Sequence, residues 1–179
     1  MREIVGGGVP PPLPRQGERW SVVSPRPGEP LELVVVGNTW LGMDCHWWTP
    51  PQATCPRSTL CLAPQACICL SEVVPDKWHG YLAVALWRTG RPAVLSLTQL
   101  GVDCLIDAAG DVKTLRGIPL VLARQSSHRS SKISATKNPK RWTYRLPDSF
   151  DLLPSLEPVF GVKEIAIWKS LYNLQEARL

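Results

Sequence analysis

Residues 46–69 read HWWTPPQATCPRSTLCLAPQACIC, and Cys45 stands directly before this stretch. Together they hold five of the six cysteines in the chain and one of its three histidines. Thiols gathered this closely can form disulfides, bind a metal ion or serve as small apolar residues of the core. Which of these roles they take decides what kind of fold the chain can build.

The remainder of the sequence favours a metal over disulfides. The first residues, MREIVGGGVPPPLP, lack the apolar segment that a secretory signal peptide needs, and the longest apolar runs, 33–36 and 81–87, are too short to span a bilayer. We therefore expect a cytoplasmic protein with no membrane association. In that reducing compartment, clustered cysteines favour metal binding.

The histidine and the cysteines follow the pattern His46-x8-Cys55-x5-Cys61-x5-Cys67-x-Cys69. Zinc takes four nitrogen or sulfur ligands at tetrahedral corners, and a proline-rich loop with few large aliphatic residues needs such an added source of stability. The preferred interpretation is a structural Zn²⁺ bound by His46, Cys55, Cys61 and Cys69, with Cys67 as the alternative ligand. Thiols buried in the core are the second interpretation, and disulfides are the third.

The sequence lacks the motifs of catalytic sites. A catalytic zinc needs an open coordination position and usually a nearby carboxylate base, but neither HxE nor HExxH occurs. The chain also has no GxSxG, no P-loop and no GxGxxG followed by a helix. We therefore expect a protein that is not an enzyme, with Cys45 and Cys104 in the core.

The hydrophobic pattern predicts a mainly β fold. The expected strands are residues 31–37, 42–49, 77–88, 91–98, 115–124 and 131–138. A short helix is expected over 98–110 and an amphipathic helix over 162–177. This order of elements suits a small OB-like barrel, with a β-sandwich or another α+β arrangement as alternatives.

The predicted organisation has three parts. Residues 1–30 are rich in proline and glycine and form a flexible arm. Residues 31–146 form the OB-like domain, with the zinc loop inserted at 46–76. Residues 147–179 form a C-terminal extension that ends in the amphipathic helix.

The positive charge is concentrated in one segment. Residues 111–145 contain nine Lys or Arg residues and a single acid, Asp111, so the segment carries +8 while the whole chain carries +5. A local excess of this size indicates a polyanionic partner, and a solvated basic surface without a partner is the alternative.

Single-stranded nucleic acid is held by cations that contact phosphates and by aromatic rings that stack on bases. The expected phosphate contacts are Arg116, Arg124, Arg129, Lys132, Lys137, Lys140, Arg141 and Arg145. The expected stacking residues are Trp142, Tyr144 and Trp48, since one of the neighbours Trp47 and Trp48 is free to face a base if the other is buried.

These features resemble a known family. His46, the cysteines of the loop, the run WHGYLAVAL from Trp78 and LRGIPLVLAR from Leu115 are similar to elements of the zinc-bearing single-stranded DNA-binding proteins of phages. Over residues 31–138, the resemblance implies an OB fold, a structural zinc in an inserted subdomain and binding of single-stranded DNA without sequence preference. The irregular cysteine spacing and the ending QEARL, in place of an acidic tail, depart from that family.

The function predicted from the sequence is therefore non-enzymatic binding of single-stranded DNA or RNA through a basic face at 113–145, with a structural zinc. The alternative is a protein-interaction or nucleic-acid-binding subunit of a larger defence, mobile-element or replication complex. In that case, the C-terminal helix would contact the partner protein.

Overall fold

The structure is a computed structural model. It describes residues 19–49, 54–55, 57–63, 65, 67–74, 76–110, 113–126, 132–143, 146 and 151–176, with the backbone alone for 172–176. Within these residues, no helix has both the length and the apolar character needed to cross a membrane.

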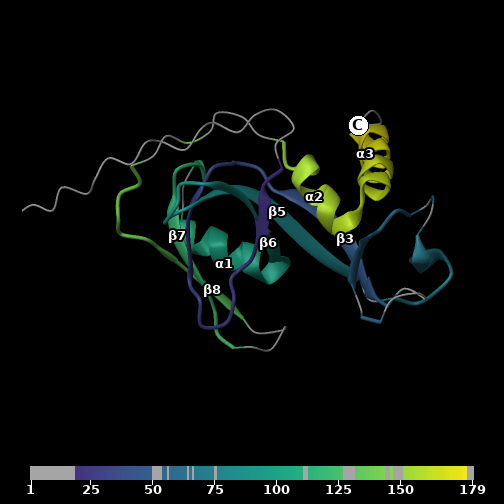
Figure 1. The fold of residues 1–179 in the computed structure, drawn as a ribbon, viewed down its shortest axis with the longest axis horizontal. Helices are drawn as coiled ribbons and strands as arrows, with labels where there is room; N and C mark the ends of the chain where they lie inside the picture. The colour runs from purple at the N-terminus through teal and green to yellow at the C-terminus, as the bar shows by residue number, and fades with distance from the viewer. Residues whose placement is uncertain are drawn as a thin grey trace, which may run out of the picture.

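The described chain is mainly β, as predicted, with three α-helices and one 3-10 turn (Figure 1). The strands are β1 (Ser21–Val23), β2 (Leu31–Val35), β3 (Leu41–Trp48), β4 (Arg57–Leu60), β5 (Asp76–Leu86), β6 (Pro92–Thr98), β7 (Pro119–Arg124) and β8 (Ile133–Lys137). The helices are η1 (Ile68–Leu70), α1 (Gln99–Ala109), α2 (Leu153–Phe160) and α3 (Val162–Glu176). Four of these elements, β1, β4, η1 and α2, were not predicted from the sequence.

All eight described strands belong to one mixed sheet that is built around the long strand β5. One edge of β5 pairs with β6, and its other edge pairs first with β3 and then with β2. Strand β7 adds to β2, and β8 adds to β7, both antiparallel. Strand β4 pairs with β3 and extends the sheet toward the cysteine loop.

The sheet does not close into a barrel, so the predicted OB-like barrel is not confirmed. Among the described strands, β8 pairs with β7 alone, and the second neighbour of β6 is β1 rather than β8. Strand β1 runs parallel to β6 and pairs with residues Ala93–Leu95. It therefore occupies the edge of β6 on which a closing strand would have to pair.

One face of the sheet packs against α1. Its core includes Leu33, Leu82, Leu95 and Leu122 from four strands, together with Leu105 from the helix, and none of these side chains is exposed. The helix ends at Gly110, whose φ of 71° lies in the left-handed region that favours glycine. The helix itself was predicted over 98–110 from the spacing of its apolar residues.

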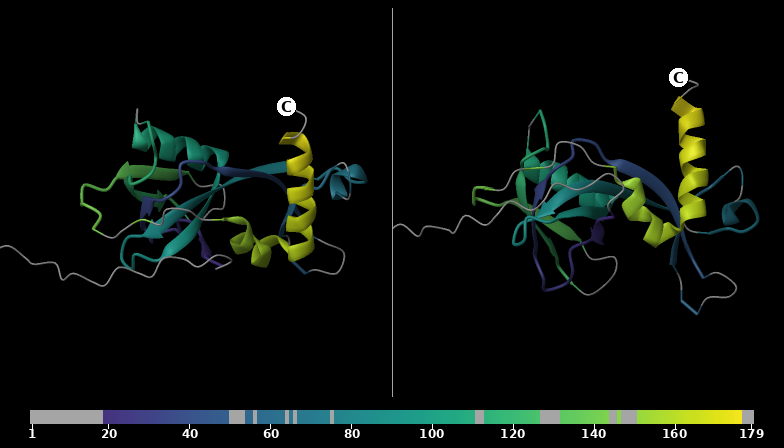
Figure 2. Two further views of the ribbon diagram at one scale, coloured as in Figure 1. Left: turned by 90° about the horizontal axis from the view of Figure 1, so that it is seen from above. Right: turned by 45° about the horizontal axis from the view of Figure 1, so that its top comes forward.

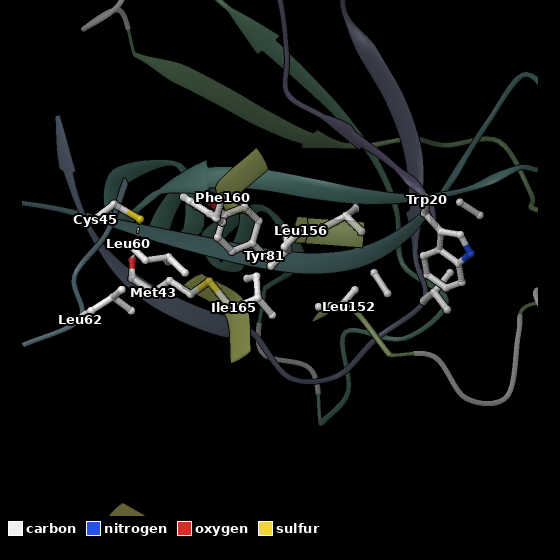
Figure 3. Packing of buried hydrophobic residues seen from close by; sticks show 14 residues of the cluster. Trp20, Met43, Cys45, Leu60, Leu62, Tyr81, Leu152, Leu156, Phe160 and Ile165 are labelled. Atoms are coloured by element: carbon white, nitrogen blue, oxygen red, sulfur yellow. Dashed lines mark hydrogen bonds between the residues drawn. The ribbon is translucent and has the colours of Figure 1, made fainter. Parts of the chain in front are cut away.

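The other face of the sheet is covered by the C-terminal helices. Leu152, Leu156, Phe160 and Ile165 are buried against Tyr81 and other residues of this face, as Figure 3 shows. Because both faces are covered, strand β2 is apolar at consecutive positions instead of alternating. The C-terminal segment is therefore part of the core.

Two glycines fix the pairing of β3 with β5. Gly42 lies opposite Gly80, and a Cβ at either position would approach the Trp78 ring to 3.0 Å or less. The ring occupies the space above both glycines. The same register places Asp76 opposite His46, which matters for the site described below.

The burial of Leu156 predicts a large loss of stability when its side chain is shortened. We expect Leu156→Ala to lower the free energy of unfolding by about 2–5 kcal/mol, because it removes a fully buried side chain and leaves a cavity. Val162→Ala on α3 is the control, since Val162 is 60% exposed. Urea unfolding of both variants measures the difference, and equal midpoints would contradict the assignment of α2 to the core.

Candidate metal centre

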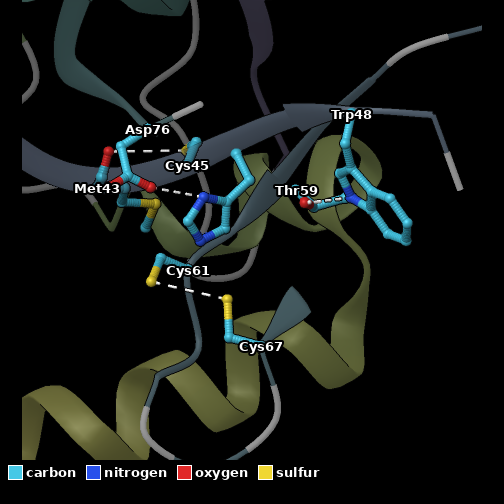
Figure 4. A network of polar contacts seen from close by, with 8 residues as sticks. Met43, Cys45, Trp48, Thr59, Cys61, Cys67 and Asp76 are labelled. Atoms are coloured by element: carbon cyan, nitrogen blue, oxygen red, sulfur yellow. Dashed lines mark hydrogen bonds and ion pairs between the residues drawn. The ribbon is translucent and has the colours of Figure 1, made fainter. Parts of the chain in front are cut away.

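Four potential metal ligands meet where the cysteine loop joins the sheet. One nitrogen of His46 and the sulfurs of Cys61, Cys67 and Cys69 all lie within 4.8 Å of one another. Figure 4 shows the Cys61 and Cys67 side chains directed toward each other from two segments of the loop. The predicted clustering of His46 with loop cysteines is therefore present in the structure.

Strand pairing places the first two ligands. His46 lies opposite Thr59 in the β3–β4 pair, and Cys61 follows directly after the end of β4. The Cys61 N–H donates to the Asp44 carbonyl oxygen at 2.8 Å, so the chain stays beside β3 for one more residue. Cys61 and His46 consequently approach from adjacent strands.

The turn η1 places the other two ligands. The N–H of Leu70 donates to the carbonyl oxygen of Cys67, and the N–H of Ser71 donates to that of Ile68. This tight turn folds the chain back within a few residues, so that Cys67 and Cys69 contribute their sulfurs to the same group. In a regular extended strand, the Cα atoms of these two cysteines would be separated by the rise of two residues.

The sulfur separation suits tetrahedral coordination. The Sγ atoms of Cys61 and Cys67 are 3.8 Å apart. Two sulfurs that each lie about 2.3 Å from a tetrahedral metal are separated by about 3.8 Å, whereas a disulfide requires about 2.05 Å. These two cysteines are free thiols at the distance that a shared metal ion would impose.

His46 is buried, with 1% of its side chain exposed. Its Nδ1 lies 2.7 Å from a carboxylate oxygen of Asp76, close but not aligned as a hydrogen bond, and its Nε2 has no hydrogen-bond partner among the described residues. A buried polar atom without a partner is costly, and a metal ion on Nε2 would remove that cost. A carboxylate on the second ring nitrogen is the usual arrangement behind a metal-bound histidine.

The three thiols do not ionise equally. Burial opposes ionisation of Cys67, but hydrogen bonds from the backbone of Cys69 and Leu62 and from the neighbouring thiols lower its pKa to about 7. The hydrogen bond with Cys67 raises the pKa of Cys69 to about 12. Cys67 is therefore the thiol of this group that ionises most readily, and a bound cation would favour the thiolate form of all three.

The other cysteines lie outside this group. Cys55, part of the preferred ligand set, is exposed and contacts the Thr54 hydroxyl at 3.8 Å, while Cys67 takes the fourth position. The hairpin explains the difference, because Cys55 precedes β4, whose first residue Arg57 lies opposite Trp48, whereas Cys61 follows the other end of β4. Cys45 is fully buried, as expected, and burial raises its pKa to about 12.

Two of the predicted phosphate-binding arginines bind the protein itself. The Arg116 guanidinium donates to the carbonyl oxygens of Val36, at 2.7 Å, and Leu146, at 3.5 Å. The Arg124 Nε donates to the Pro25 carbonyl oxygen at 3.1 Å. Both side chains are half-buried and connect distant segments, and their predicted contacts with phosphate stay a prediction.

The other described residues among the predicted phosphate contacts are exposed at one edge of the sheet. They are Lys132, Lys137, Lys140 and Arg141, on β8 and on the segments beside it. Ser134 and Thr136 are exposed on β8 as well, consistent with the shared face predicted for them and Lys132. Arg129, Tyr144 and Arg145 lie outside the described residues.

The two described members of the predicted aromatic set, Trp142 and Trp48, have different surroundings. Trp142 is half-buried against the core, with its ring 5.3 Å from that of Trp87, and its predicted role in base stacking stays a prediction. Trp48 donates from its indole nitrogen to the Thr59 hydroxyl at 3.0 Å and lines a cleft of about 200 Å³. Neither this cleft nor the position of Asp76 beside His46 was predicted from the sequence, because both depend on the register of the strands.

Comparisons with known proteins add no further constraint. No protein-family model matches the chain, and no curated protein or solved structure is significantly similar to it.

The geometry predicts which cysteines hold a metal. We expect Cys67→Ser to lose bound metal, because it removes one of the four clustered ligands, and Cys55→Ser to keep one metal ion per chain. Elemental analysis after dialysis gives the stoichiometry, and the absorption of the Co²⁺-loaded proteins reports thiolate ligation. Loss of metal in Cys55→Ser with retention in Cys67→Ser would overturn the assignment.

Proposed function

We propose that this protein binds single-stranded nucleic acid through an exposed basic edge and that a structural zinc ion stabilises it. The observation that carries the proposal is the set of exposed cations beside β8: Lys132, Lys137, Lys140 and Arg141. Within the described part of the chain, no carboxylate lies within ion-pair distance of any of these four cations.

The ligand set supports zinc as the metal. Three thiols and one imidazole form a common structural zinc site, and soft sulfur ligands disfavour magnesium or calcium. Four protein ligands leave no open position for a water molecule, so the metal would hold the loop rather than take part in a reaction.

The basic edge carries the right kinds of groups for phosphate binding. Ser134 and Thr136 are exposed hydroxyls on the same strand as Lys137, and Lys132 directly precedes that strand. Cations and hydroxyls spaced along an extended edge can follow a phosphate backbone without reading its sequence. Residues 111–145, which include these four cations, carry a net charge of +8 in the sequence.

The strand connectivity is compatible with an open version of the OB fold. In that fold, a helix follows the third strand, and the loops after the first and the fourth strands contact the oligonucleotide. If β2–β3, β5, β6, β7 and β8 are taken as the five strands, then α1 follows the third. The two binding loops then correspond to the cysteine loop and to the turn between β7 and β8.

The sheet face over β5 and β6 is not available for bases. In an OB fold, the second and third strands contribute much of the binding surface. Here the matching residues, including Tyr81 and Val94, are buried beneath α2 and the segments next to it. The proposal therefore assigns binding to the exposed edge at β8 and to the loops.

A second candidate function is protein interaction through α3. This helix projects from the body of the molecule in Figures 1 and 2, and Val162 at its first turn is 60% exposed. A projecting helix with an exposed apolar residue is a plausible site for a partner protein. Nucleic-acid binding by the isolated chain would then be weak and would require that partner.

The proposal predicts that oligonucleotide affinity falls steeply with salt concentration and that this dependence comes from the cations of the basic edge. We expect Lys132→Glu combined with Arg141→Glu to weaken binding of a fluorescent oligonucleotide at low salt. The slope of log K against log salt should fall by about two, because two phosphate contacts are lost. Fluorescence anisotropy at several salt concentrations measures both effects.

The matched control changes the same charge elsewhere. Lys163→Glu combined with Lys169→Glu alters two exposed lysines of α3 and changes the net charge by the same amount. Equal weakening in both double variants would indicate an effect of net charge alone. No binding by the unaltered protein at low salt would rule out the proposed function for the isolated chain.

A further inference from the structure

The cleft beside the metal centre is formed by three separate parts of the chain. The β3–β4 hairpin contributes Trp48 and Arg57, the cysteine loop contributes Cys67 and Ile68, and the α2–α3 junction contributes Phe160 and Glu164. Its volume of about 200 Å³ is below the ~300–1,000 Å³ typical of pockets for drug-sized ligands. A single small ring fits this space better than a whole cofactor.

Trp48 presents an aromatic surface with a fixed orientation. Its indole N–H donates to the Thr59 hydroxyl at 3.0 Å, and Thr59 lies on the strand paired with β3. A ring held in this way loses little conformational entropy when another flat ring stacks on it. Stacking of one base on an aromatic ring contributes about 1–3 kcal/mol.

The polar groups of the cleft carry opposite charges. Arg57 lies directly opposite Trp48 in the strand pair and is exposed, so its guanidinium is available to an anion near the ring. The Glu164 carboxylate lies against Gly161 at the first turn of α3, where a Cβ on Gly161 would come within 3.0 Å of it. A carboxylate accepts hydrogen bonds from the amino group of a base such as cytosine.

We propose that this cleft binds one amino-bearing nucleobase of the bound strand. The base stacks on Trp48, its amino group donates to Glu164, and its phosphate contacts Arg57. The inference rests on the proposed nucleic-acid-binding function and adds a base preference to it, because thymine and uracil have a carbonyl group in place of the amino group of cytosine.

The metal centre and the cleft share a wall. Cys67 belongs to the ligand group and also lines the cleft, with Ile68 next to it in η1. A metal ion that fixes Cys67 therefore fixes one side of the proposed base site. Removal of the metal should weaken base binding in the cleft more than phosphate binding at the basic edge beside β8.

Nuclear magnetic resonance of the ¹⁵N-labelled, zinc-loaded chain tests the inference, since each tryptophan gives one indole N–H signal. Trp48→Phe identifies the signal of Trp48 by its loss. We expect dCMP to shift that signal saturably, with an affinity about fivefold or more above that of dTMP. Glu164→Gln should remove most of this difference, and Arg57→Gln should weaken dCMP binding more than binding of the cytosine nucleoside.

The outcomes separate this inference from the proposed function. If oligonucleotides bind but dCMP leaves the Trp48 signal unchanged, the base site is wrong and the basic edge alone carries binding. An equal response to dCMP, dTMP and phenol would mark a non-specific apolar cleft and would also overturn the inference. If neither dCMP nor any oligonucleotide binds at low salt, the inference and the proposed function both fail.

Discussion

The convergence of one imidazole and three thiols is the constraint on which the cysteine loop depends. His46 comes from β3, Cys61 follows β4, and Cys67 and Cys69 flank the start of η1, so a single ion bound there would connect all three segments. Apart from Leu60 and Leu62, the described residues of this loop contribute little to the core. A metal bound by these four ligands would give the loop stability that hydrophobic burial does not provide.

The second constraint is that both faces of the sheet are buried. Helix α1 covers one face, and the C-terminal helices cover the other, where Leu156 and Phe160 pack on Tyr81. This arrangement leaves edges and loops as the exposed parts of the β structure. It explains why the candidate functions lie at the periphery: cations beside β8, the cleft beside β4 and the projecting helix α3.

The apolar periodicity of the sequence predicted most of the strands and helices. The remaining features depend on pairing between strands that are distant in the sequence. The long strands and α1 follow from apolar periodicity, whereas β1 and β4 are too short to display a period. Helix α2 was missed because it contains Pro154 and Pro158, although a proline is tolerated in the first turn. The predicted barrel does not close because β1 pairs with the edge of β6. This pairing joins residues far apart in the sequence, so a local sequence pattern does not predict it.

For the candidate site, the close spacing of cysteines and a histidine in the sequence predicted a metal centre. Which cysteines belong to it depends on the strand register, which brings Cys67 and not Cys55 to the group. X-ray absorption at the zinc edge of the purified protein tests the central claim most directly. The account predicts one zinc ion with three sulfur ligands at about 2.3 Å and one nitrogen ligand at about 2.0 Å. Four sulfur ligands, a shell of oxygen ligands, or a folded protein that binds no metal would contradict it.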